Sequence, residues 1–158
     1  MTRKKETKIV ILGSYNSGKT TTVGSICDKK TEIEYKGTTI ALDYGNTIIN
    51  GEKIHIFGSP GQERFEFMRK ILSYGLNGAI VVIDSLKGAT TIDESIIKSL
   101  NSHNIPYVVF ANKQDLNPVF PEFEGITEDV PVVPTVALEG KGVNYGLKVL
   151  LSRINSTS

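Results

Sequence analysis

A glycine-rich segment at residues 13–20, GSYNSGKT, carries the clearest chemical signal in the chain. It matches the pattern G-x-x-x-x-G-K-S/T and lies between an apolar run and a segment with helical spacing. The backbone amides of such a loop and the positive end of the following helix converge on phosphate oxygens, and glycine permits an approach that a Cβ would block. The motif therefore predicts a nucleoside triphosphate site with the ligands Gly13, Asn16, Ser17, Gly18, Lys19, Thr20 and Thr21.

Two side chains of this segment have specific roles in phosphate chemistry. The ammonium of Lys19 can reach the β- and γ-phosphates, and the hydroxyl of Thr20 can ligate magnesium. The motif alone does not indicate which base the bound nucleotide carries.

A second cluster, Asn112-Lys113-Gln114-Asp115, follows directly on an apolar run that ends at Ala111. An aspartate carboxylate accepts two hydrogens at once from guanine, one from N1 and one from the exocyclic amine. Adenine lacks this pair of donors, so a buried Asp115 would stay unpaired opposite it, which gives strong discrimination. The cluster alone is a weak signal, because asparagine, lysine and aspartate are common surface residues after a strand.

With both motifs in these places, the chain resembles a small GTPase of the Ras/Rab/Arf superfamily, in which N-K-x-D reads guanine. The resemblance implies that Asn112 braces the phosphate loop and that the stem of Lys113 covers one face of the base. Residues 136–138, VAL, stand where the family has Ser-Ala-Lys. The last base contact would then be a backbone amide of Ala137 or Leu138.

Residues 36–44, KGTTIALDY, are similar to the switch I stretch of Rab-type proteins. On this match Thr39 ligates magnesium and senses the γ-phosphate, with Thr38 as the alternative. Strand propensity alone would make the two threonines the start of a β-strand.

Residues 58–65, GSPGQERF, resemble the switch II sequence Asp-Thr-Ala-Gly-Gln-Glu-Arg-Phe, and the variant here is similar to a prokaryotic branch of small GTPases. The resemblance implies that Gly61 donates its amide to the γ-phosphate and that Gln62 orients the attacking water. The catalytic set is then Gln62, Lys19 and Gly61; the alternative is that this stretch is a solvated helix start.

Two departures from the family pattern have consequences. Gly58 replaces the aspartate that holds magnesium through a water, so we expect weaker magnesium binding unless Asp43 or Asp84 supplies a carboxylate. Tyr15 occupies a loop position where many relatives keep a small residue. We expect its ring to crowd an arginine supplied by a partner.

Apolar and amphipathic segments alternate along the chain, which predicts an α/β fold with right-handed crossovers. Expected strands are residues 8–13, 39–50, 53–57, 78–84, 105–112 and 132–136, and expected helices are 18–29, 65–76, 90–103 and 144–154. Asn50-Gly51 is a strong hairpin signal, and residues 117–131, with three prolines, predict a loop. The resemblance implies a P-loop NTPase of the Ras-like G-domain type, with a mostly parallel six-stranded sheet, one antiparallel hairpin strand and helices on both faces.

The 158 residues suit one domain, 1–158, in which we expect 1–7 to be a flexible lead-in and 155–158 a flexible tail. The formal charge of +1 gives no sign of nucleic-acid binding. A single cysteine, Cys27, excludes an internal disulfide and is expected in the core. No lipid anchor or membrane-spanning run is evident, which predicts a soluble, cytoplasmic protein recruited to membranes only through a partner.

These features predict slow hydrolysis of GTP to GDP and phosphate, on the order of 10⁻⁴ to 10⁻² s⁻¹. Mg²⁺ is the expected cofactor, and effector and regulatory proteins would read the nucleotide state through switch I and switch II. The alternative is a GTPase-like binding module that holds nucleotide as a docking element with little or no hydrolysis. A P-loop kinase or ATPase is disfavoured because Gly58 replaces the usual acid and because residues 112–115 favour guanine.

Overall fold

The structure is a computed structural model that describes residues 6–13, 17–27, 33–35, 38–41, 43–58, 75–116 and 130–157. The side chains of Thr20, Thr157 and the strand residues between 33 and 44 lie outside this description. No helix in these ranges is both long and apolar enough to cross a bilayer.

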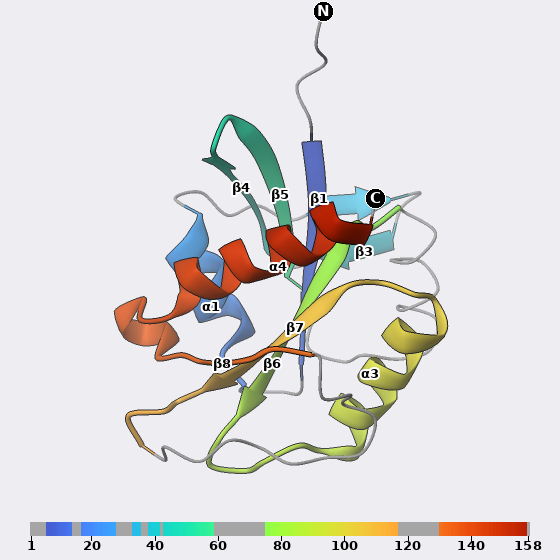
Figure 1. Ribbon diagram of the computed structural model, residues 1–158. Coiled ribbons are helices and arrows are strands. Elements are labelled where there is room, and N and C mark those ends of the chain that lie inside the picture. Colours follow the sequence, from blue (N-terminus) through green and yellow to red (C-terminus); the bar gives the residue numbers. More distant parts are fainter. Residues whose placement is uncertain are drawn as a thin grey trace, which may run out of the picture.

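A six-stranded sheet in the order β4-β5-β1-β6-β7-β8 forms the centre of the molecule (Figure 1). Its strands are β1 (Glu6–Leu12), β4 (Asp43–Ile49), β5 (Glu52–Gly58), β6 (Gly78–Asp84), β7 (Tyr107–Asn112) and β8 (Val132–Pro134). The β4–β5 pair is antiparallel around Asn50-Gly51, and the other neighbouring pairs are parallel. The predicted sheet architecture is confirmed.

Helices pack on both faces of this sheet, and two apolar layers result. On one face α1 (Lys19–Ile26) and α4 (Val143–Thr157) cover side chains such as Ile9, Ile80 and Val82. On the other face α3 (Thr91–Ser102) covers Val10, Val81 and Ile83. Because both faces are covered, β6 is buried throughout, as a continuous apolar run predicts. Cys27 is buried in the first layer, as predicted.

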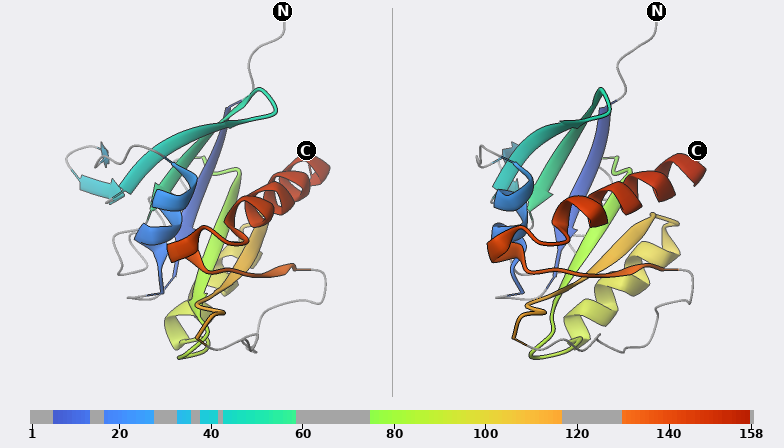
Figure 2. Two further views of the ribbon diagram at one scale, coloured as in Figure 1. Left: turned by 90° about the vertical axis from the view of Figure 1, so that its left-hand side faces the viewer. Right: turned by 60° about the vertical axis from the view of Figure 1, so that its left-hand side comes forward.

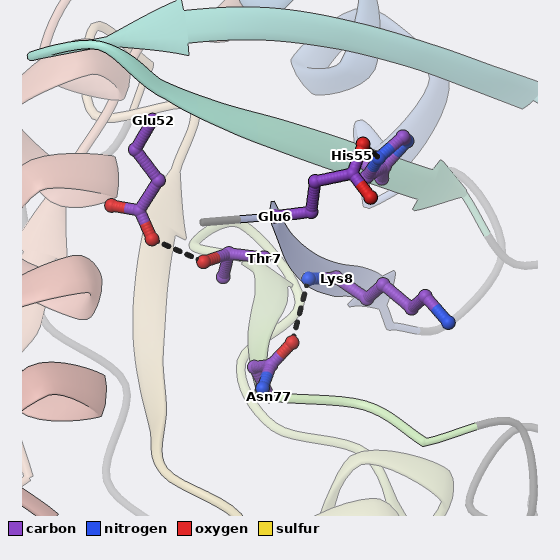
Figure 3. A network of polar contacts seen from close by, with 6 residues as sticks. All are labelled: Glu6, Thr7, Lys8, Glu52, His55 and Asn77. Atoms are coloured by element: carbon purple, nitrogen blue, oxygen red, sulfur yellow. Dashed lines mark hydrogen bonds and ion pairs between the residues drawn. The ribbon is translucent and has the colours of Figure 1, made fainter. Parts of the chain in front are cut away.

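The expectation of a flexible lead-in over residues 1–7 is wrong for Glu6 and Thr7, which belong to β1. Thr7 is fully buried, and its hydroxyl donates a hydrogen bond to the carboxylate of Glu52 (Figure 3). The Glu6 carboxylate lies 3.4 Å from Nε2 of His55, and the Lys8 amide donates to Oδ1 of Asn77 at 2.8 Å. Contacts with β5 and with Asn77, the residue before β6, therefore hold the first strand from Glu6 onward.

Two other boundaries differ from the prediction. The last helix continues to Thr157, so the proposed tail begins too early. Residues 39–50 are not one strand: β3 (Thr38–Ala41) pairs antiparallel with β2 (Ile33–Tyr35) in a separate two-stranded sheet, and β4 begins at Asp43. The predicted helix at residues 65–76 lies outside the described residues except for Gly75 and Leu76, which are in no helix.

The two ends of the parallel strands are clearly separated. The hairpin turn lies beside the start of β1, since Glu6 pairs with Lys53, and Figure 2 shows both at the same end of the sheet. Gly13, Asp84 and Asn112 stand at the opposite end, where the parallel strands finish. Ligands of open α/β sheets bind at this carboxyl end.

Candidate functional site

The first wall of the candidate site is the turn from β1 into α1. Gly13 and Gly18 adopt φ values of 151° and 108°, a region that disfavours residues with a Cβ. A Cβ on Gly13 would lie 2.3 Å from the carbonyl oxygen of Val82, and one on Gly18 would lie 2.2 Å from Nδ2 of Asn112. Both glycines of the motif are therefore required by the backbone and by close neighbours.

Two polar side chains of this turn are buried at the loop. Lys19 is 7% exposed, and its ammonium donates to the carbonyl of Gly13 at 2.5 Å, which keeps the positive charge at the loop. The hydroxyl of Ser17 is buried and has no hydrogen-bond partner in the described part of the chain. A buried cation and a buried hydroxyl beside two crowded glycines fit a ligand that carries anionic oxygens.

Asn112, at the end of β7, joins three segments through one side chain. Its Nδ2 donates to the carbonyl of Ser17 at 2.9 Å, while its Oδ1 accepts from Oγ1 of Thr135 and the amide of Ala137, both at 3.0 Å. The orientation of the side-chain amide is fixed because a carbonyl can only accept and a backbone amide can only donate. The predicted bracing of the phosphate loop by Asn112 is thus observed.

Lys113 forms an ion pair that the sequence did not predict. Its ammonium donates to Oδ2 of Asp84 at 2.9 Å, and the Asp84 side chain is 3% exposed. Asp84 was expected as a possible magnesium carboxylate, but its second oxygen accepts from the Leu86 amide at 2.8 Å. Both oxygens of Asp84 are therefore engaged in holding its own turn and Lys113.

Charge and burial act in opposite directions on Asp84. Burial raises the pKa of this carboxyl, but the hydrogen bonds from Lys113 and Leu86 and the charges of Lys113 and Lys87 lower it further than burial raises it. The pKa of Asp84 therefore lies below its ordinary value. The carboxylate is ionised at neutral pH.

The residues expected to contact the base are arranged on the neighbouring turns. Asp115, two residues after Lys113, is exposed. The prediction of guanine assumed a buried Asp115 carboxylate, and a bound base would have to bury it. Ala137 starts the short 3-10 helix η1 (Ala137–Glu139), whose Leu138 side chain is 87% exposed. The Ala137 amide already donates to Asn112, so a bond from it to the base would have to share or replace this contact.

Several predicted site residues lie outside the described residues. Asn16, Tyr15, Gly61 and Gln62 are in this group, and the expectations for them stay predictions. The backbones of Thr20 and Thr21 lie in the first turn of α1, and those of Thr38 and Thr39 lie in β3. In the described ranges, no group of three or more His, Cys, Asp or Glu residues is placed to hold a metal.

The sequence analysis missed the contacts that join the turns after β6 and β7. Besides the Asp84–Lys113 pair, Nε2 of Gln114 donates to the hydroxyl of Ser85 at 2.9 Å. The sequence did show that two apolar strands end in Asp84 and Asn112, and the ends of neighbouring parallel strands lie side by side. Without the register, the partner of Asp84 was not determined.

Taken together, the strand–loop–helix turn, the mostly parallel sheet and the braced N-K-x-D turn define a G domain of the P-loop GTPase class. The comparison with family models agrees, because residues 8–113 match the 50S ribosome-binding GTPase model. The chain belongs to this family of GTPases.

Two curated relatives are similar to more than two thirds of this chain. The uncharacterized protein MJ1339 of Methanocaldococcus jannaschii is 50% identical over 117 residues, which are 74% of this chain and 76% of that protein. The Ras-related protein Rab-32C of Dictyostelium discoideum is 30% identical over 118 residues, 69% of this chain but 52% of Rab-32C. The similarity to the second relative thus leaves about half of that protein unmatched.

Solved structures show the same fold at low sequence identity. The G domain of the T. maritima FeoB iron transporter has a TM-score of 0.73 at 18% identity, with 95% of this chain and 99% of that chain covered. Translation elongation factor SelB of Methanococcus maripaludis, in complex with the GTP analogue GppNHp, has a TM-score of 0.72 at 20% identity. This chain is covered completely, and it spans 35% of SelB.

Proposed function

We propose that this chain binds guanine nucleotides, hydrolyses GTP slowly to GDP and phosphate, and acts as a nucleotide-dependent switch for a partner protein. The observation that carries the proposal is the bond from Asn112 to Ser17, because it fixes the base-reading turn against the phosphate loop. This bond brings two motifs, which lie about a hundred residues apart in sequence, together at the carboxyl end of the sheet.

Phosphate binding would come from the loop and its buried cation. Lys19 already lies at the loop with its charge buried, and the Ser17 hydroxyl offers a further donor or acceptor to a phosphate oxygen. Asn112 would hold the loop in place, and Asp115 would accept two hydrogens from guanine. The fit between these groups and a nucleoside triphosphate supports GTP and GDP as ligands.

Magnesium would be held by the hydroxyls of Thr20 and Thr39 together with phosphate oxygens, and it would neutralise charge on the transferring phosphoryl group. Gly58 ends β5 without the carboxylate of the family pattern, and Asp84 is engaged with Lys113. We therefore expect weak magnesium binding. Substituting Gly58→Asp should make GDP release more sensitive to EDTA than in the wild type; equal sensitivity would contradict this role of Gly58.

Hydrolysis would depend on Gln62, which orients water, and on Gly61, whose amide contacts the γ-phosphate. Slow turnover is expected by analogy with related switches, and Tyr15 would hinder an arginine supplied by a partner. If the Tyr15→Gly variant gains nothing from candidate activating proteins, this effect of Tyr15 is refuted.

The switching role follows from the two segments expected to contact the γ-phosphate, residues 36–44 and 58–65. Their order would depend on the nucleotide, and effector and regulatory proteins would bind the ordered form. The partner class is protein, and any recruitment to a membrane would occur through such a partner.

A single-turnover assay with radiolabelled GTP tests the proposal against a binding module that does not hydrolyse. The wild type should release phosphate at least ten times faster than Gln62→Leu, while both bind GDP equally well. Equal, very slow rates with intact GDP binding would support the binding module. Absence of nucleotide binding in both proteins would refute the proposed function altogether.

A further inference from the structure

The turns that follow β6 and β7 are joined by two side-chain bonds. Asp84 and Asn112 are register partners in the parallel sheet, so the turns begin side by side. Lys113 donates to Asp84 at 2.9 Å, and the next residue, Gln114, donates to Ser85 at 2.9 Å. Two successive residues of the N-K-x-D turn are therefore anchored to two successive residues of the β6 turn.

The β6 turn is itself rigid, so it can serve as a fixed support. The Asp84 carboxylate accepts from the Leu86 amide at 2.8 Å, and its carbonyl accepts from the amides of Lys87 and Gly88 at 3.1 and 2.8 Å. The carboxylate that receives Lys113 thus cannot move without breaking its own turn. A buried acceptor held in this way fixes the position of the group that it binds.

The backbone of Lys113 needs such support. Lys113 has a φ of 63°, a left-handed conformation that is strained for a residue with a Cβ and persists only where contacts hold it in place. Both sequence neighbours of Lys113 are held by hydrogen bonds. The side chain of Asn112 donates to the carbonyl of Ser17, and the amide of Gln114 donates to the carbonyl of Thr135 at 3.2 Å. The ion pair with Asp84 fixes the side chain of the strained residue as well.

We propose that Asp84 is a positioning residue for guanine: it holds the Lys113 side chain and, through the turn, the Asp115 carboxylate in the geometry that the base requires. This inference rests on the proposed function. Asp84 contacts neither base nor phosphate and acts only through Lys113 and its turn. Because the effect concerns the base, it should be the same for GDP and GTP.

The test uses the variant Asp84→Asn, because an asparagine of nearly the same volume keeps an oxygen for the Leu86 amide. Its amide nitrogen then takes the place of the carboxylate oxygen that accepts from Lys113, so both the negative charge and the acceptor for Lys113 are lost. Affinities of the full chain for fluorescent mant-GDP and mant-GTP are measured for wild type, Asp84→Asn, Lys113→Met and the double variant. Glu6→Gln is the matched control, since it removes one carboxylate charge from a pair at the opposite end of the sheet.

Asp84→Asn should weaken both nucleotides by about tenfold and leave their ratio unchanged. In the Lys113→Met background the same substitution should have less than a twofold effect, which a general loss of stability would not produce. Glu6→Gln should equal the wild type.

The inference is overturned if Asp84→Asn binds within twofold of the wild type, or if its full effect persists in the Lys113→Met background. Thermal melts identify an Asp84→Asn protein that fails to fold. In that case the nucleotide affinity of Lys113→Met is compared with that of the double variant, in which neither charge of the ion pair remains. A tenfold weaker affinity of the double variant than of Lys113→Met would also overturn the inference. If the wild type binds neither nucleotide, the proposed function fails instead.

Discussion

The side-chain amide of Asn112 donates a 2.9 Å hydrogen bond to the carbonyl of Ser17, which lies 95 residues earlier in the chain. The same side chain accepts from Thr135 and Ala137, so the phosphate loop, β7 and η1 share a single buried residue that is 3% exposed. The phosphate-loop motif and the N-K-x-D turn are therefore held together by Asn112, and the first prediction tests whether this link couples stability to nucleotide binding.

Substituting Asn112→Ala should reduce stability and nucleotide affinity together. Three hydrogen bonds are lost and buried partners are left unsatisfied, which costs about 2–4 kcal/mol and lowers Tm by roughly 5–12 °C. Differential scanning calorimetry and mant-GDP titration measure the two effects. Asn144→Ala, at an exposed asparagine in α4, should change neither, and an Asn112→Ala protein with wild-type affinity would contradict the link.

Substituting Gly18→Ala should abolish tight nucleotide binding, with a loss of more than about a hundredfold. The new Cβ would lie 2.2 Å from Nδ2 of Asn112 and would displace the bracing side chain. Gly51→Ala is the matched control, because Gly51 has a φ of 80° but no atom within 4 Å of the added carbon. This control should lose only about 1 kcal/mol of stability from backbone strain and should bind mant-GDP normally.

Substituting Asp115→Asn should move specificity from guanine to xanthine nucleotides. An asparagine amide can donate to the C2 carbonyl of xanthine but no longer accepts two hydrogens from guanine, which predicts a loss of about 10³-fold or more for GDP. Competition of XDP and GDP against a fluorescent nucleotide measures the change. Unaltered preference for GDP would remove Asp115 from the base contact.

The contribution of Asp84 to stability should depend on pH in a definite direction. Because the folded-state pKa is lowered, the pair with Lys113 stabilises the protein above the unfolded-state pKa of about 3.9, and the stabilisation is lost as the pH falls through the folded-state value. Urea unfolding of wild type and Asp84→Asn should differ by about 1–3 kcal/mol at pH 6 and pH 8 alike, and by less near pH 3. A difference that grows on acidification would contradict the assignment.

The glycine-rich turn after β1 and the strand that leads to Asn112 were predictable from the sequence because local residue patterns determine them. Gly13 and Gly18 are where the backbone has left-handed φ values, and the apolar run before Asn112 is a strand buried on both faces. The hairpin followed from Asn50-Gly51, and the capping box of α3, in which Thr90 and Asp93 exchange hydrogen bonds, marks the predicted helix start.

What the sequence did not predict depends on contacts between distant segments. Thr7 looked like part of a polar tail, but Glu52 satisfies its hydroxyl inside the fold. Asp84 looked available for a metal, but the register of β6 and β7 brings it to Lys113. The end of β3 was missed because Thr38–Ala41 pairs with Ile33–Tyr35, and a continuous run of strand formers does not show where a pairing partner changes.

Isothermal titration calorimetry of nucleotide-stripped protein is the most direct measurement of the central claim, that one carboxylate and one braced loop select a guanine nucleotide. GDP and GTP should each give a saturable heat with one site per chain, and ADP at the same concentrations should give none. Heats of equal size for ADP and GDP would contradict the choice of base, and no heat with any of the three would contradict nucleotide binding itself.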